Sequence, residues 1–111
     1  MTTYLPKDVD DNPIPAVRLS DGGAHEITTG ASSVRNSTAF NADTRLISLY
    51  ATEDVYVNFG DDTVTAANTD HFFPKGVYYD LAIGGGKVNQ YTHVAALQVS
   101  AAGKLYISEK E

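Results

Sequence analysis

Three consecutive glycines at 84–86, followed by Lys87, are the first candidates for chemistry, because glycine-rich loops can bind phosphate. Such a loop lies between a strand and a helix, where backbone amides and the helix N-terminus converge on the anion. Here the following residues, KVNQY, are typical of a strand, and Val88 stands where a P-loop has its magnesium-binding hydroxyl. The sequence therefore predicts a turn or bulge at 84–86, for which glycine supplies the positive φ angle.

A metal site is the second chemistry to consider. His25, His71 and His93 are far apart in the sequence and match neither the H-x-H nor the H-E-x-x-H spacing of metal ligands. We interpret them as structural or surface histidines, although side chains distant in sequence can meet in a fold. A small hydrolase or a cupin-like metal enzyme therefore stays an open alternative.

The acidic segment DVDDN places Asp8, Asp10 and Asn12 at alternate positions, as calcium-binding loops do. An EF-hand loop needs a glycine for its sharp turn and a bidentate glutamate at its twelfth position. This sequence has Pro13 and Leu19 at those two places. We therefore expect a solvated acidic segment here and no calcium site.

Nucleophilic catalysis has no recognisable residues in this sequence. The chain contains no cysteine and no G-x-S-x-G motif, and Ser20, Asp21 and His25 are too close along one turn to form a triad. The sequon at 36–38 is interpreted as a chance match, because no secretory signal accompanies it. We expect a protein that is not an enzyme, with no catalytic residues, no metal ligands and no cofactor.

Aromatic residues are the remaining signal, with seven tyrosines, four phenylalanines and no tryptophan. If strands bury alternate residues, Tyr50, Tyr56, Tyr78 and Tyr106 point outward while their neighbours fill the core. Exposed tyrosines are enriched at protein interfaces and suit sugar-binding grooves, although cross-strand pairing on a solvated sheet also explains them. These four residues are predicted interface residues.

The elements that position these side chains are short strands, because apolar residues alternate with polar ones and no helical period persists over three turns. Alternation is clearest at 44–51, 55–59 and 77–83, where residues such as Ile47 and Val57 fall on the inward side. About eight strands at this spacing predict an all-β domain, an antiparallel β-sandwich or jelly-roll.

The connections between strands are predicted from their turn residues. DGG at 21–23 and GDD at 60–62 are predicted turns, and the Ser-rich 31–43 a long connection with one partial strand. A short strand is expected around Val64. TED at 52–54 is predicted to join the clearest hairpin, and AAG at 101–103 to close a terminal one.

The bulk properties fit one domain of 111 residues with a net charge of −6. Scattered basic residues argue against nucleic-acid binding, and no apolar run is long enough to cross a membrane. Residues 1–15 hold three of the four prolines and are predicted to form an extended arm, followed by a β-sandwich domain at 16–111. Within the arm, Tyr4, Leu5 and Pro6 are further predicted interface residues.

The order of elements at 44–109 resembles small β-sandwich proteins from the head and tail gene modules of tailed bacteriophages and prophages. The resemblance lies in an Ala-Thr turn at 51–52, a V-x-V-x-F-G strand at 55–60, a Thr- and Asn-rich loop at 63–69, and F-P-K-G at 73–76, before two closing strands. It implies a structural protein of the virion, such as a capsid decoration (cement) protein, a head-fibre base or a small tail component. Such proteins are often homo-oligomers, commonly trimers, and have no catalytic residues to carry over.

The leading hypothesis from the sequence is therefore a non-enzymatic phage structural protein. It would be made late, in the host bacterial cytoplasm, associate with itself and bind the major capsid protein or a tail protein. Its acidic charge would limit adhesion to packaged DNA. The alternative is a carbohydrate- or receptor-binding module that uses exposed tyrosines, against which the lack of tryptophan counts.

Overall fold

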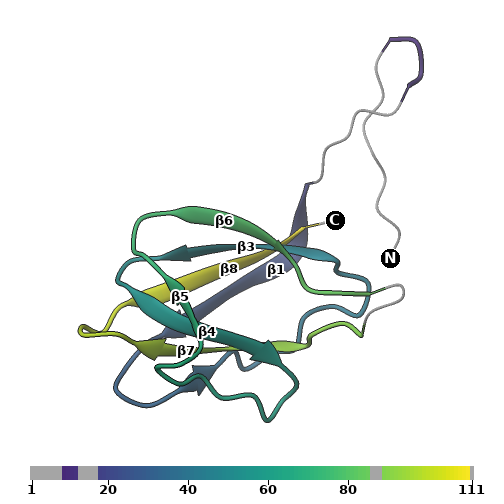
Figure 1. Cartoon of the computed structure of the whole chain (residues 1–111). Helices are drawn as coiled ribbons and strands as arrows, with labels where there is room; N and C mark the ends of the chain where they lie inside the picture. The colour runs from purple at the N-terminus through teal and green to yellow at the C-terminus, as the bar shows by residue number, and fades with distance from the viewer. Residues whose placement is uncertain (1–8, 13–17, 86–88, 111) are drawn as a thin grey trace.

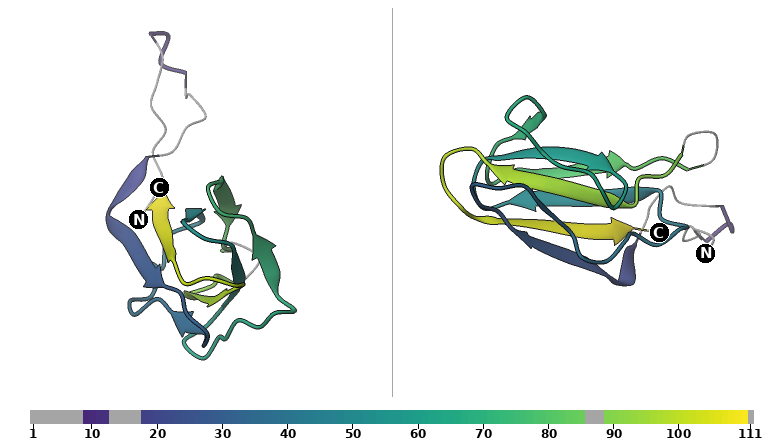
Figure 2. Two further views of the ribbon diagram at one scale, coloured as in Figure 1. Left: turned by 90° about the vertical axis from the view of Figure 1, so that its left-hand side faces the viewer. Right: turned by 90° about the horizontal axis from the view of Figure 1, so that it is seen from below.

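The computed structural model describes residues 9–12, 18–85 and 89–110. Eight strands form two antiparallel four-stranded sheets that pack face to face (Figures 1 and 2), and the described residues contain no helix. One sheet has the order β1-β8-β3-β6 and the other β2-β7-β4-β5. The strands are β1 (Leu19–Thr28), β2 (Val34–Arg35), β3 (Leu46–Ala51), β4 (Val55–Gly60), β5 (His71–Phe73), β6 (Tyr78–Ala82), β7 (His93–Gln98) and β8 (Lys104–Lys110).

The pairing of the strands is nested. β1 pairs with β8, β2 with β7, β3 with β6 and β4 with β5, so the chain resembles one long hairpin wrapped into two sheets. Two further pairings, β3 with β8 and β4 with β7, complete the sheets. This is the topology of a jelly-roll, and it confirms the predicted all-β class and the number of strands.

The core lies between the sheets and follows the period of two read from the sequence. Ile47, Leu49, Val55 and Val57 are at most 1 % exposed, as predicted, because alternate residues of each strand face the opposite sheet. Burying such side chains stabilises the fold by roughly 1.5–3 kcal/mol each. The other large members of this core are Ile27, Phe40, Ile83, Val94, Leu105 and Ile107.

Both predicted hairpins are wrong. The three residues 52–54 join β3 to β4, which lie in different sheets, and the connection 99–103 likewise joins β7 to β8 across the sandwich. A short loop that crosses between layers has the same turn residues as a hairpin loop, and the alternating pattern does not identify a strand's partner. Among the described strands, β4 and β5 are the one consecutive pair that are neighbours in a sheet, and the long segment 61–70 connects them.

The predicted turn at 21–23 is also wrong. β1 continues through it as a bulge, because Leu19 and Ala24 are five positions apart while their partners, Lys110 and Ser108, are two positions apart. Gly22 adopts a φ of 70°, which L-residues rarely adopt, so the bulge needs a glycine at this position.

Two further local predictions fail and several are confirmed. No strand forms around Val64, and β5 was not predicted, since three residues give too little alternation to detect. The partial strand within 31–43 is β2. The F-P-K-G segment at 73–76 ends β5 in a turn, in which the Gly76 N–H donates to the Ala51 carbonyl. The predicted strand at 77–83 forms as β6 (Tyr78–Ala82), and Tyr79 and Leu81 pack against the core, but the strand lies at a sheet edge.

Candidate interaction surface

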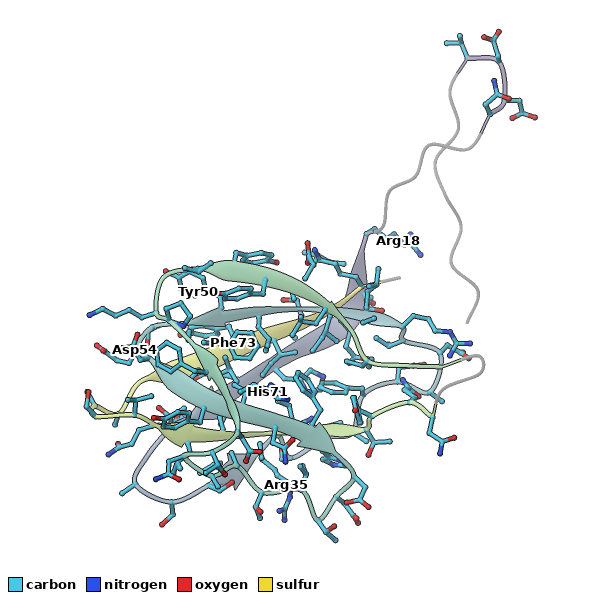
Figure 3. All side chains as sticks on the ribbon, in the orientation of Figure 1. Arg18, Arg35, Tyr50, Asp54, His71 and Phe73 are labelled. Carbon is cyan, nitrogen blue, oxygen red and sulfur yellow. The ribbon has the colours of Figure 1, made fainter. Side chains whose placement is uncertain are left out.

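The outer face of the β1-β8-β3-β6 sheet carries three of the predicted interface tyrosines in one row. Tyr50 on β3 lies opposite Tyr106 on β8 and Tyr78 on β6, with Glu26 of β1 continuing the row beyond Tyr106. The three tyrosines are 37 %, 42 % and 58 % exposed. Residues directly opposite on neighbouring strands have neighbouring side chains, so the three tyrosines lie side by side on one face. We call this surface the tyrosine face; Tyr50 is labelled in Figure 3.

Hydrogen bonds and charge hold one end of the row. The Tyr78 hydroxyl donates to Ser48 Oγ at 2.7 Å, and Ser48 is buried beneath it. Lys110 Nζ lies 5.5 Å from the centroid of the Tyr78 ring and 2.6 Å from Asp80 Oδ1. The Tyr78 ring is therefore fixed by a hydroxyl contact and by a cation–π contact.

An ion pair lies at the other end. Lys104 on β8 pairs with Glu26 on β1, and the hydrogen bond and negative charge of Glu26 raise the pKa of the Lys104 amine. Both groups are about half exposed. The tyrosine face therefore has an aromatic centre between two charged ends, which is the usual anatomy of a protein interface.

Tyr56, the fourth predicted tyrosine, lies on the other sheet. It is opposite Phe72, and the two rings meet edge to face with centroids 6.0 Å apart. The four tyrosines therefore do not form one surface, although all four point outward. Tyr4, Leu5 and Pro6 lie outside the described residues.

The outer face of the β2-β7-β4-β5 sheet is covered by the chain itself over part of its area, while Phe72 on the same face stays exposed. Residues 61–70, the covering loop, fold over it: Arg35 donates to the Val64 carbonyl at 2.8 Å and the Asn58 amide to the Thr65 carbonyl at 3.1 Å. Ala95 faces outward between Arg35 and Asn58, yet it is fully buried. We call this surface the covered face.

The covering loop begins with the predicted GDD turn, which is confirmed. Asp61 Oδ1 accepts hydrogen bonds from the N–H and hydroxyl of Thr63 at 2.9 and 2.6 Å, and these bonds lower the pKa of Asp61. Further along, the Ala66 N–H donates to Ser33 Oγ, which ties the loop to the residue before β2. The loop is thus held by its own polar groups.

His25 is a structural histidine, in line with its interpretation from sequence. Its Nε2 lies 2.8 Å from Glu109 Oε2, and its ring meets Phe40 edge to face at 5.2 Å. Glu109 Oε1 also accepts from the Thr44 hydroxyl at 2.6 Å and from the Asn41 N–H at 2.7 Å. Because an ionised carboxylate only accepts, the His25 Nε2 carries a hydrogen.

The same network sets the charge of Glu109, which is 5 % exposed. Burial raises the pKa of its carboxyl, but the hydrogen bonds from Thr44, His25 and Asn41 outweigh burial and leave the pKa below its ordinary value of 4.5. The carboxylate therefore anchors residues 41–44 at one end of the sandwich. Among the described residues, no serine or threonine hydroxyl is bonded to His25, so His25 and Glu109 are not part of a catalytic triad there.

The remaining sequence candidates have local roles. Within the described ranges, no three histidine, aspartate or glutamate side chains gather as a metal site would require. Asn36 is buried and bonded through both atoms of its amide, to Thr38 and Val94, so its sequon is inaccessible in the folded chain. Gly84 has a φ of 101° and lies so close to the Asn89 carbonyl that a Cβ would clash with it, which fits the predicted turn or bulge.

One feature was not predicted: an aromatic cleft of about 400 Å³ that opens between β5 and β6, the edge strands of the two sheets. Stacked rings of Phe59 and Tyr91, with centroids 5.7 Å apart, line it together with Phe72, Phe73 and His71. Figure 3 labels His71 and Phe73 on β5. Sequence reasoning missed the cleft because these residues come from three separate segments.

Comparisons with known proteins assign no family. No protein-family model matches the chain, and no curated protein matches it. A solved structure from a study of Bacillus endospore appendages, described there as a family of disulfide-linked pili, is similar with a TM-score of 0.49 and 16 % sequence identity. The match covers 86 % of this chain and 85 % of that chain. At this level of similarity nothing about function follows from it.

The described residues contain no helix that could span a membrane.

Proposed function

We propose that this chain is a non-enzymatic structural protein that associates with copies of itself through the tyrosine face. The observation that carries the proposal is the row of Tyr78, Tyr50 and Tyr106 across three neighbouring strands. An aromatic row this exposed is unusual on a monomer's surface, whereas tyrosines concentrate at the centres of interfaces.

The ends of the row favour a second copy as the partner. Each end carries one acidic and one basic side chain, Glu26 with Lys104 and Asp80 with Lys110. A surface that offers both signs at both ends can pair with itself without placing like charges together, as a two-fold interface requires. The rings would supply most of the buried area and the ion pairs the register.

The proposed assembly is a virion, in which the chain acts as a capsid decoration protein or a small tail component. The resemblance of residues 44–109 to head and tail proteins supports this role, and the jelly-roll occurs in viral capsid proteins. Lectins and cupins share this architecture, so the fold alone does not choose among the three classes. Co-sedimentation of the purified chain with phage capsids tests the virion role directly, and a chain that stays in the supernatant contradicts it.

Sedimentation velocity over a concentration series tests the self-association. We expect the wild-type chain to form oligomers that a Tyr50→Ser/Tyr106→Ser double variant loses. The control is Tyr56→Ser, which removes an outward ring from the covered face and leaves the oligomers intact. Thermal melting shows that each variant is folded. A monomeric wild type at every concentration contradicts the proposal, and glycan binding by that monomer would favour the carbohydrate-binding alternative.

A further inference from the structure

We propose that the aromatic cleft binds the Tyr4-Leu5-Pro6 segment of a neighbouring copy, an inference that rests on the proposed self-association. The cleft is a built concavity, and its volume of about 400 Å³ lies in the range of about 300–1,000 Å³ usual for binding sites. Four aromatic rings line it, those of Phe59, Phe72, Phe73 and Tyr91.

The polar groups of the cleft favour an apolar occupant over a sugar. The amide of Asn58, at the cleft wall, is already used: its nitrogen donates to the Thr65 carbonyl and its oxygen accepts from the Phe59 N–H. The other polar groups of the lining are the His71 ring and the Tyr91 hydroxyl, while Phe59, Phe72, Phe73, Leu81 and Ala82 make the rest of it apolar. A sugar needs several unengaged hydrogen-bonding groups around its hydroxyls, whereas a Leu-Pro pair needs aromatic walls and few polar contacts.

The chain itself supplies a segment of that chemistry. Tyr4, Leu5 and Pro6 are consecutive, and proline-containing segments dock well in aromatic grooves because a fixed φ lowers the entropy lost on binding. Eighteen residues precede Leu19, and an extended chain of that length reaches as far as about 60 Å, enough to reach an adjacent subunit. Residues 9–12 lie away from the sandwich in Figures 1 and 2, and Val9 is fully exposed. The described part of the arm therefore does not fill the cleft.

The tyrosine face and the cleft are different surfaces, so one subunit can use both. The tyrosine face is the outer side of one sheet, while the cleft opens between the edges of both sheets. An arm docked in the cleft would tie together subunits already joined by their tyrosine faces, and a second linkage raises the effective concentration of the first.

Photo-crosslinking of the full-length chain tests the inference. Leu5 is replaced by the photo-crosslinker benzoylphenylalanine, and equal amounts of unlabelled and nitrogen-15-labelled chains are mixed. After irradiation, mass spectrometry identifies the crosslinked peptides. We expect adducts on the cleft residues, chiefly Phe72 and Tyr91, half of them joining a labelled to an unlabelled chain. The same probe at Ser32, in an exposed turn, is the position control and should give no cleft adduct.

Two variants decide between the outcomes. Phe72→Ser removes an exposed ring of the lining and should lower the adduct yield about ten-fold, the effect of losing about 1.4 kcal/mol of ring contact. In the Tyr50→Ser/Tyr106→Ser background, chains that meet transiently at high concentration should still give the cleft adduct although they form no stable oligomer, so failure of the arm contact and failure of the tyrosine-face contact are measured separately. Adducts within single chains only, adducts outside the cleft, or none at all would each overturn the inference.

Discussion

Each outer face of this sandwich belongs to a four-stranded sheet, but the two faces differ in how much of them other parts of the chain cover. On the covered face, the covering loop bonds to outward side chains of β2 and β4, and Ala95 beneath them is fully buried. On the tyrosine face none of the described residues forms such a loop, and three rings stay between 37 % and 58 % exposed. The difference shows that the chain's own residues cover part of one outer face, around Ala95, and leave the row of tyrosines on the other exposed.

The difference has an energetic consequence. Groups on the covered face exchange water for intramolecular contacts when the chain folds, so changes there should alter the free energy of unfolding. Groups on the tyrosine face keep much of their water in the single subunit, so changes there should alter association while leaving the subunit stable. The following predictions separate these two effects.

The largest effect is expected from a charge under the covering loop. Ala95→Asp places a carboxylate in a fully buried position between Arg35 and Asn58, and we expect a loss of about 3 kcal/mol or more. Ala24→Asp is the matched change on the tyrosine side, where Ala24 is exposed opposite Ser108, and should cost under about 0.5 kcal/mol. Urea unfolding measures both. Equal costs would show that the two faces are equally open.

A smaller effect is expected from Glu109, which belongs to neither outer face. Glu109→Gln should cost about 1–3 kcal/mol at pH 7, because three hydrogen bonds to a buried carboxylate lose their charge. Since folding lowers the pKa of this carboxyl, its contribution is present above pH 4.5 and disappears as the pH falls through the folded pKa. The gap between wild type and variant in urea unfolding should therefore close with acidification, and sedimentation at pH 7 should be unchanged. A gap that is constant with pH contradicts the assignment.

The buried hydroxyl beneath the tyrosine face should give an effect near 1 kcal/mol. Tyr78→Phe removes the donor to Ser48 Oγ and leaves Ser48 buried without it, which costs about 1 kcal/mol. Tyr106→Phe removes a hydroxyl for which no such buried acceptor exists among the described residues and should cost about 0.3 kcal/mol at most. Thermal melts compare the two. If both variants melt together, the Tyr78 hydroxyl does not hold the row.

The smallest effect is expected from the exposed ion pair at the end of the row. Exchanging its members, Glu26→Lys with Lys104→Glu, should leave the melting temperature of the single subunit unchanged, because exposed pairs contribute little to stability. The exchange should still shift the oligomer equilibrium in sedimentation at low salt and lose that influence at high salt. An unchanged equilibrium at low salt would place this pair outside the interface.

The residue pattern predicted the core and the outward tyrosines, because period two in a strand fixes which side chains share a face. Ile47, Leu49, Val55 and Val57 were identified as inward this way, and Tyr50, Tyr56, Tyr78 and Tyr106 as outward. It did not predict strand partners: TED and AAG look like hairpin loops, and both cross between sheets. It also took DGG for a turn, since a bulge and a turn need the same positive φ.

The sequence alone is sufficient for the all-β class, the number of strands and the two sides of each strand, because these depend on residues a few positions apart. Which tyrosines lie together depends on the register between distant strands, since Tyr50 is 28 residues from Tyr78 and 56 from Tyr106. Only the fold therefore places these three in one row and Tyr56 on the other sheet. The aromatic cleft and the partners of Glu109 likewise come from segments distant in sequence. Such juxtapositions depend on strand order, and the alternation of apolar and polar residues carries no information about strand order.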